Sequence, residues 1–138
     1  TAYYQQIVAY CKAHNLSDRV LALKGVSMQE LAMIYQQAEV FCYPSVFEGF
    51  GIPIIEALFS RVPVITSQGS CFAEAGGAHS CYIQLDKAAD EIREAIVRIS
   101  SDRAFREEMI EKGYAHAQRF TDEAVYEQLM AVYRKVVR

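Results

Sequence analysis

The first half of the sequence passes from an apolar run to a glycine-containing loop and then to an apolar helix. The run Ala38–Tyr43 has the length and composition of a buried strand. The loop carries Gly49 and Gly51 on either side of Phe50, and Pro53 stands in the first helical turn, which tolerates its missing N–H. A strand that ends in such a loop and opens a helix brings free backbone N–H groups and the positive helix end together. We therefore expect an anion-binding site here.

Two acidic residues flank this loop, Glu48 before the glycines and Glu56 inside the helix. Because carboxylates repel phosphate but accept hydrogen bonds from hydroxyls, the pair predicts a ligand that is both a diphosphate and a polyol, such as a nucleotide-sugar. The neighbours of Glu56 are apolar, and a buried acid needs a partner or a shifted pKa. One alternative is that each acid only complements the helix end, which contributes about 0.3–1 kcal/mol. Another is a pair of glycosidase carboxylates, although a diphosphate leaving group needs cations and N–H donors rather than a proton.

The stretch from Pro44 to Ala57 resembles the donor-binding signature of the group 1 (family 4) glycosyltransferases, which are retaining enzymes of the GT-B architecture. That signature reads Pro-Ser, two variable residues, Glu-Gly-Phe-Gly, one variable residue, Pro, two more, and Glu-Ala. This chain matches it without a gap at Pro44-Ser45, Glu48-Gly49-Phe50-Gly51, Pro53 and Glu56-Ala57. The family pattern continues with Pro63-Val64-Ile65 and Glu74.

The resemblance implies a role for each matched position. Glu48, as the catalytic residue, would bind hydroxyls of the donor sugar near the reacting carbon, and Glu56 would accept both ribose hydroxyls of the nucleotide. The residues whose backbone would face the phosphate and sugar oxygens are Gly49, Phe50, Gly51 and Ile52. The expected donor-binding set also includes Ser45, Gly25 and Val26. Gly25 and Val26 would line the base through backbone contacts at a neighbouring strand end.

No cofactor or metal is expected beyond the nucleotide-diphosphate sugar, which is a substrate. The aspartates are scattered without an Asp-x-Asp motif, and the three histidines share no spacing. We interpret His79 as a surface residue and Arg61 as a cation at a helix end. The segment Gly76–Ser80 lacks the acidic residue common there in the family, so the sugar is harder to predict than donor binding.

Alternating strand and helix patterns predict an α/β fold with a Rossmann-like parallel sheet and helices on both faces, one partial half of a GT-B architecture. Buried strands are expected at Val20–Leu23, Ala38–Tyr43 and Val62–Thr66, and a last short strand at Cys81–Leu85, with a loop over Ser67–Gly77. Helices are expected over 2–14, after an N-cap at Ser27, over 88–100, over 102–120, and from Thr121 onward. On the last helix, Val125, Leu129, Val132 and Val136 favour a core role, although in the resembled family this helix crosses to the amino-terminal domain. The four cysteines are expected to be reduced core thiols, with Cys42 in a buried strand.

With 138 residues the chain predicts one domain, residues 1–138. The resemblance covers nearly the whole chain but only the later part of the family's donor-binding domain. We therefore expect a fragment that lacks the first strand–helix units and the whole amino-terminal acceptor domain. The Arg and Lys that neutralise the donor pyrophosphate in the family would lie in the absent part, so the fragment alone is expected to be inactive.

The function that follows is donor binding for glycosyl transfer to a saccharide or lipid-linked glycan, in glycan or polysaccharide biosynthesis. The alternatives are a non-catalytic module with the same fold, or a relative of glycogen synthase or phosphorylase. The net charge of −3 and the lack of a basic run argue against a nucleic-acid partner. No apolar stretch approaches the ~20 residues of a membrane span, and no signal peptide opens the chain, so we expect a cytoplasmic location. Any peripheral membrane association would come from the missing domain.

Overall fold

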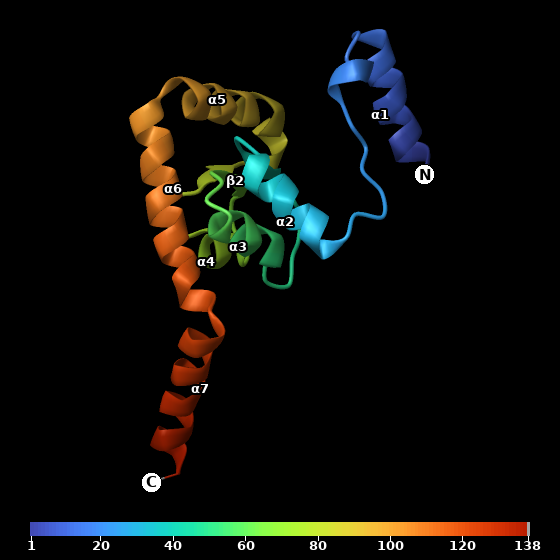
Figure 1. Cartoon of the computed structure of the whole chain (residues 1–138). Helices are drawn as coiled ribbons and strands as arrows, with labels where there is room; N and C mark the ends of the chain where they lie inside the picture. The colour runs from blue at the N-terminus through green and yellow to red at the C-terminus, as the bar shows by residue number, and fades with distance from the viewer. Residues whose placement is uncertain (138) are drawn as a thin grey trace.

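Figure 1 shows the computed structural model, which describes residues 1–137. The helices are α1 (Ala2–Ala13), α2 (Met28–Gln37), α3 (Ile52–Phe59), α4 (Phe72–Gly76), α5 (Ala88–Ser101), α6 (Arg103–Ala117) and α7 (Asp122–Val136). The strands are β1 (Phe41–Tyr43), β2 (Val64–Ser67) and β3 (Cys81–Ile83). Short 3-10 turns lie at Ser17–Arg19, Leu85–Lys87 and Gln118–Phe120.

The three strands form one parallel sheet in the order β1-β2-β3. The central strand β2 is buried at all four residues, as expected for a strand covered on both faces. Neighbouring residues of β2 enter different cores, because side chains alternate across a strand: Val64 joins one hydrophobic cluster and Ile65 the other. The predicted Rossmann-like sheet with helices on both faces is confirmed.

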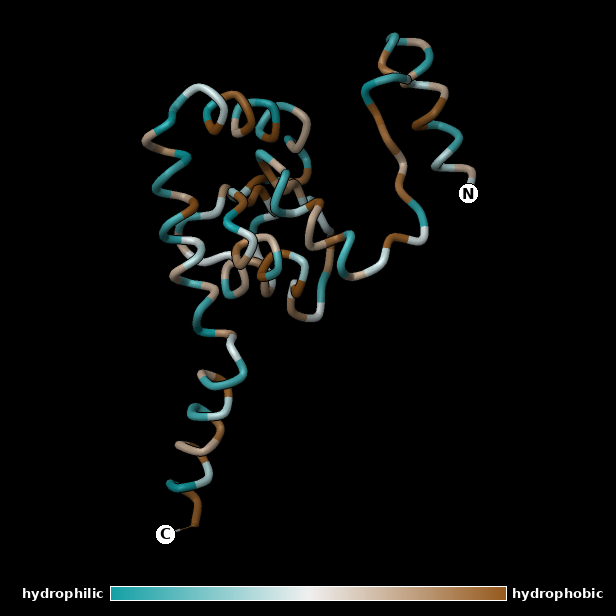
Figure 2. The backbone as a smooth tube through the Cα atoms, viewed as in Figure 1, coloured by the Kyte–Doolittle hydropathy of each residue, from teal (hydrophilic) through white to brown (hydrophobic). Residues whose placement is uncertain are grey.

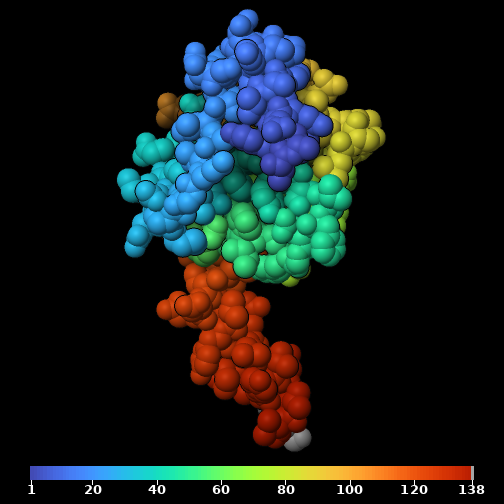
Figure 3. Space-filling model, turned by 90° about the vertical axis from the view of Figure 1, so that its right-hand side faces the viewer, coloured from blue at the N-terminus to red at the C-terminus, as the bar shows by residue number. Residues whose placement is uncertain are grey.

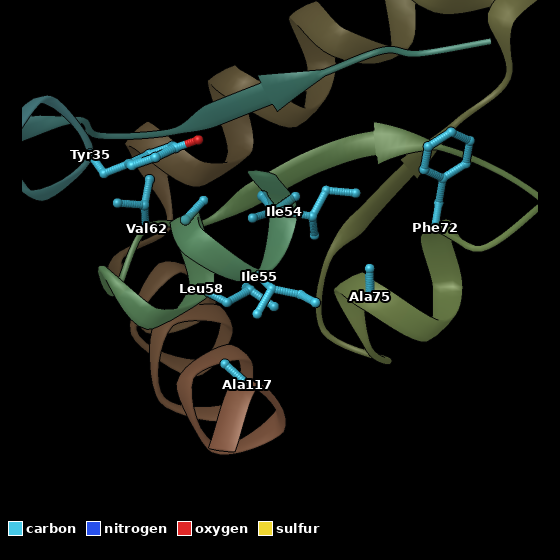
Figure 4. Packing of buried hydrophobic residues seen from close by; sticks show 10 residues of the cluster. Tyr35, Ile54, Ile55, Leu58, Val62, Phe72, Ala75 and Ala117 are labelled. Atoms are coloured by element: carbon cyan, nitrogen blue, oxygen red, sulfur yellow. The ribbon is translucent and has the colours of Figure 1, made fainter. Parts of the chain in front are cut away.

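The larger core lies between the sheet and the helix that follows the glycine loop. Figure 4 shows Ile54, Ile55 and Leu58 of α3 packed among side chains of α2, α4 and the end of α6. On the other face, Ile65 and Ile83 of the sheet meet α5 and α6. The loop is therefore followed by a helix whose core-facing side chains are almost completely buried.

Local sequence signals explain where several helices begin. The predicted N-cap of α2 at Ser27 is confirmed, and it is part of a capping box: Ser27 N donates to Glu30 Oε2 at 2.8 Å, and Glu30 N donates to Ser27 Oγ at 3.3 Å. Thr121 caps α7 by accepting from Ala124 N at 3.2 Å. These hydrogen bonds satisfy backbone N–H groups that have no partner inside the helix.

The expected strand Val20–Leu23 is wrong. Val20 has extended backbone angles, yet the segment pairs with no strand among residues 1–137, and Leu21 is 81% exposed. In Figure 1 this segment runs from α1 to α2 at a distance from the sheet, and in Figure 2 it is a mostly apolar tube. A parallel strand needs a hydrogen-bonded neighbour and covered faces, and the segment has neither in this position.

The core role expected for the stripe on the last helix is also wrong. Leu129 is 51% and Val132 is 58% exposed, because α7 leaves the body after the turn at Gln118–Phe120. Figure 3 shows this helix projecting from the rest of the molecule. The turn that precedes α7 packs against the core cluster, through Phe120.

Two smaller expectations also fail. All four cysteines are free as expected, but only Cys11 is buried, and Cys42 is exposed. Cys42 lies on the edge strand β1, whereas α5 packs against β3 and leaves that part of the sheet open. The expected loop Ser67–Gly77 contains α4, because Phe72 and Ala75, spaced for one helix face, are both buried in the core.

Candidate functional site

The loop from Pro44 to Gly51 leaves the carboxyl end of β1, the edge at which ligands of parallel sheets bind. Buried polar side chains at the end of β2 fix this loop. Ser67 Oγ donates to the Ser45 carbonyl at 2.6 Å, and Thr66 Oγ1 donates to the Tyr43 carbonyl at 2.9 Å. Sequence reasoning missed both anchors, although a Thr-Ser pair closing an apolar strand was a usable signal.

The two glycines of the loop are needed for different reasons. Gly51 is the N-cap of α3 and has φ +91°, a conformation that favours glycine. A Cβ there would lie 3.3 Å from both Ala75 Cβ and Ile54 Cδ1. At Gly49 a Cβ would meet nothing within 4 Å, so the protein itself does not require a glycine at that position.

The loop amides face no protein acceptor. Within residues 1–137, no hydrogen bond joins the N–H groups of Gly49, Phe50, Gly51 or Ile52 to a protein atom. Pro53 has no N–H, and the first N–H of the helix that has a protein acceptor is that of Ile54, which donates to the Gly51 carbonyl at 2.9 Å. Bare amides beside the positive end of a helix form an anion-binding site.

Glu48 is half-buried and held by two hydroxyls. Its Oε1 accepts from Tyr43 Oη at 2.5 Å and from Ser45 Oγ at 3.0 Å. The bond to Glu48 raises the pKa of the Tyr43 hydroxyl, because the carboxylate stabilises its protonated form. In the part of the chain that the structure describes, Oε2 of Glu48 has no protein donor. Ser45, expected to bind the donor, thus uses its hydroxyl to orient Glu48.

Glu56 is half-buried, and its Oε2 accepts from Tyr35 Oη at 3.3 Å. Burial, and next the charge of Glu56 and this hydrogen bond, raise the pKa of Tyr35 to about 12. Glu56 also borders an apolar groove of about 220 Å³ between α2 and α3. The other residues that line this groove are Met28, Leu31, Ala32, Tyr35, Phe59 and Ser60. The expectation that Glu56 needs a partner is met by Tyr35, which the sequence did not identify.

A row of three aromatic rings connects the two acids. Tyr35 of α2 packs edge to face on Phe41 of β1, with centroids 5.2 Å apart, and Phe41 stacks beside Tyr43 at 5.7 Å. Because Tyr35 binds Glu56 and Tyr43 binds Glu48, the carboxylates stand at the two ends of one continuous row. Glu48 and Glu56 therefore belong to one side of the sheet rather than to unrelated surfaces.

The remaining predicted residues lie around this row. Gly25 and Val26 follow the exposed segment rather than a strand, so the strand end expected there is wrong. They lie just before Met28, which borders the groove at Glu56. His79 is a surface residue 3.8 Å from Glu108, in agreement with its interpretation.

Arg61 lies at the end of α3, as predicted, and pairs with Glu111 at 2.8 Å on the surface.

Among residues 1–137 no group of three or more His, Cys, Asp or Glu side chains is arranged to hold a metal ion. None of the helices described is both long and apolar enough to span a membrane.

The sequence profile of the family described as "Glycosyl transferases group 1" matches residues 2–116, which include the whole loop. The chain belongs to this family. The predicted membership in the group 1 glycosyltransferases is therefore confirmed.

Individual relatives agree with this assignment. The chain is 31% identical over 125 residues to the MMP alpha-(1->4)-mannosyltransferase of Mycolicibacterium hassiacum, a match covering 88% of this chain and 30% of that protein. It is 44% identical over 71 residues to the O-antigen chain mannosyltransferase RfbU of Salmonella typhimurium, covering 51% of this chain and 20% of that one.

A solved structure gives the same result for the fold. The sucrose-phosphate synthase from Thermosynechococcus elongatus superposes with a TM-score of 0.82 and 28% identity, over 99% of this chain and 35% of that protein. This match confirms the predicted GT-B fold. The chain spans about a third or less of the group 1 glycosyltransferases and the synthase that it matches.

Proposed function

We propose that this chain binds the nucleotide-sugar donor for retaining, metal-independent glycosyl transfer to a saccharide or lipid-linked glycan. The observation that carries the proposal is the combination, on one loop and its helix, of bare amides and two acids held by tyrosine hydroxyls. Amides suit phosphate, and carboxylates suit sugar hydroxyls. The mannosyltransferase names of the relatives favour a hexosyl donor in polysaccharide biosynthesis.

In this proposal each part of the site takes one part of the donor. The amides from Gly49 to Ile52 bind phosphate and sugar oxygens, a preorganised electrostatic role. Glu56 accepts the ribose hydroxyls, and the apolar groove beside it takes the base, with the backbone of Gly25 and Val26 at its edge. Glu48 binds hydroxyls of the transferred sugar. The open space at Gly49 lets a ligand approach the backbone.

The reaction breaks the bond between the anomeric carbon and the diphosphate oxygen, and the diphosphate leaves with the electron pair. The acceptor hydroxyl passes its proton to the departing diphosphate oxygen and forms the new bond on the same face of the sugar. The site must therefore stabilise a sugar with oxocarbenium character and a leaving group that gains charge. The Glu48 carboxylate, held close to the transferred sugar, stabilises the positive charge that develops on that sugar. The loop amides stabilise the negative charge that develops on the diphosphate.

We further propose that the chain works as the donor-binding half of a longer polypeptide. An amino-terminal domain would supply the acceptor site and the cations that neutralise the pyrophosphate, and any contact with the cytoplasmic face of a membrane. Residues 1–138 alone should then show no sugar transfer from GDP-mannose or UDP-glucose. Turnover by the purified 138-residue chain would contradict this part of the proposal.

The residue assignment is tested by Glu56→Ala in the polypeptide that includes the amino-terminal domain. Hydrogen bonds to a charged group are worth about 1.5–3 kcal/mol each, so losing even one ribose contact should raise the donor KM at least about tenfold. Glu111→Ala is the matched control, because it removes a carboxylate that is exposed and pairs with Arg61 on the surface. Equal donor KM in the Glu56→Ala and Glu111→Ala proteins would refute the assignment of Glu56 to the ribose.

A further inference from the structure

An aromatic contact holds the middle of the glycine loop. Phe120 packs edge to face against Phe50, with ring centroids 5.6 Å apart. Phe50 is the residue between the two loop glycines, whereas Phe120 closes the turn that separates α6 from α7. Phe120 is half-buried and packs against the larger core cluster, so it offers the loop a fixed support.

The Phe50 ring is only partly covered. It is 38% exposed and, with Phe120, borders a cavity of about 210 Å³. Val125 and Gln128 of α7 line the same cavity. If the Phe120 ring were removed, the cavity would enlarge and Phe50 could shift into it, taking the amides on either side of it along.

His116 contacts both Phe120 and α4. Its ring lies edge to face with Phe120 at 5.5 Å, and its Nε2 donates to the Glu74 carbonyl of α4 at 2.8 Å. Nε2 carries the proton here because a carbonyl oxygen only accepts. The ring also lies against the backbone of Gly77, where an added Cβ would come within 2.7 Å of it.

This contact with α4 reaches the loop by a separate route. Ala75 of α4 is the residue whose Cβ lies closest to the position that a Cβ on Gly51 would take. The end of α6 and the turn after it therefore support the loop by two routes: directly through Phe120 on Phe50, and indirectly through His116 on α4, which lies beside Gly51.

We infer that Phe120 is a positioning residue for the Gly49–Ile52 amides, and that His116 keeps it in place. The packing role of Phe120 does not depend on the proposed function. Its effect on donor binding does rest on that function, because the amides must be fixed if they are to bind phosphate. Phe120 directly precedes the N-cap of α7, so the residue that contacts Phe50 in the loop is the neighbour of the residue that caps that projecting helix.

The experiment measures backbone amide order parameters in the 15N-labelled 138-residue chain. Phe120→Leu keeps an apolar side chain but removes the ring edge, and Phe120→Tyr keeps the ring. Tyr114→Leu is the matched control, because Tyr114 makes an edge-to-face pair with Phe59 across α6 and α3, away from the loop. In Phe120→Leu, the order parameters at Gly49 and Gly51 should fall from about 0.85 toward 0.6, the flexible range. They should stay near the native value in Phe120→Tyr and Tyr114→Leu.

Unchanged order parameters at Gly49 and Gly51 in Phe120→Leu would overturn the inference, and so would an equal fall in Tyr114→Leu. A titration with GDP-mannose and UDP-glucose, in the polypeptide with the amino-terminal domain, then separates this inference from the proposed function. An edge-to-face pair is worth about twofold to tenfold in an equilibrium, so donor affinity should weaken by that factor in Phe120→Leu. If neither nucleotide-sugar binds the native protein, the proposed function fails, whereas the order parameters still decide the role of Phe120.

Discussion

The two loop glycines allow stability to be separated from binding. Gly51→Ala places a side chain at φ +91° and 3.3 Å from Ala75 Cβ and Ile54 Cδ1. A left-handed backbone costs about 1–2 kcal/mol for an L-residue, and the tight contacts add to this. The reduced entropy of the unfolded chain returns about 0.4–1 kcal/mol. The net loss is about 1–2 kcal/mol, which for a chain of this size lowers Tm by roughly 4–8 °C.

Gly49→Ala should behave in the opposite way. Its Cβ meets nothing within 4 Å and its φ is not positive, so stability should change by no more than about 0.5 kcal/mol. The added methyl group would stand where the donor approaches, and affinity for the nucleotide-sugar that binds best should fall about tenfold or more. Thermal melting and donor titration of both variants provide the test. If Gly49→Ala lowered Tm as much as Gly51→Ala does, the reasoning from φ and free space would be refuted. If it bound donor normally, the loop would not contact the ligand.

Three further predictions concern the surroundings of the loop. Tyr35 should deprotonate near pH 12 in an absorbance titration, and Tyr35→Phe should remove that step. Because the pKa of Tyr35 in the folded protein lies above the ordinary value of 10.0, its contribution to stability is complete below pH 10 and is lost as the pH rises toward 12. Gly113→Ala should lower the free energy of unfolding by about 1 kcal/mol, since its Cβ would come 2.7 Å from Leu58 Cδ2 and overpacking outweighs the gain in helix propensity; Leu58→Val should restore part of the loss. Ser27→Ala should destabilise α2 by about 1 kcal/mol in chemical denaturation, because the Ser27 hydroxyl that accepts from Glu30 N is lost, whereas an unchanged midpoint would show that this cap is dispensable.

The sequence predicted well wherever a local pattern determines the structure. The helix starts at Ser27 and Thr121 depend on neighbours a few residues away, and the structure confirms them. The exposure of Leu21 and Leu129 depends on which other segment packs over them. An apolar run or stripe indicates that a residue can be buried but does not identify the segment that would cover it. At Leu129 the helix was predicted correctly but its burial was wrong, whereas at Leu21 both the strand and its burial were wrong.

The site divides in the same way. The glycine loop and its two acids lie in one contiguous stretch, so spacing alone could identify them. Tyr35, which binds Glu56, lies 21 residues away in sequence, and Ser67, which anchors the loop, belongs to the next strand. Sheet order and helix packing bring these side chains together, and neither can be read from the spacing of a motif.

The tyrosine bonds explain how two acids can stand beside an anion site without destabilising it. Each carboxylate uses one oxygen on a protein hydroxyl: Glu48 uses Oε1 on Tyr43 and Ser45, and Glu56 uses Oε2 on Tyr35. The second oxygen of each acid receives no protein donor within residues 1–137. Hydroxyls satisfy an acid without cancelling its charge, so each carboxylate is oriented while it keeps its ability to accept. A cation in the same place would have weakened that ability, and oxygens left free in this way are suited to accept hydrogen bonds from a ligand rich in hydroxyls, as the proposed function requires.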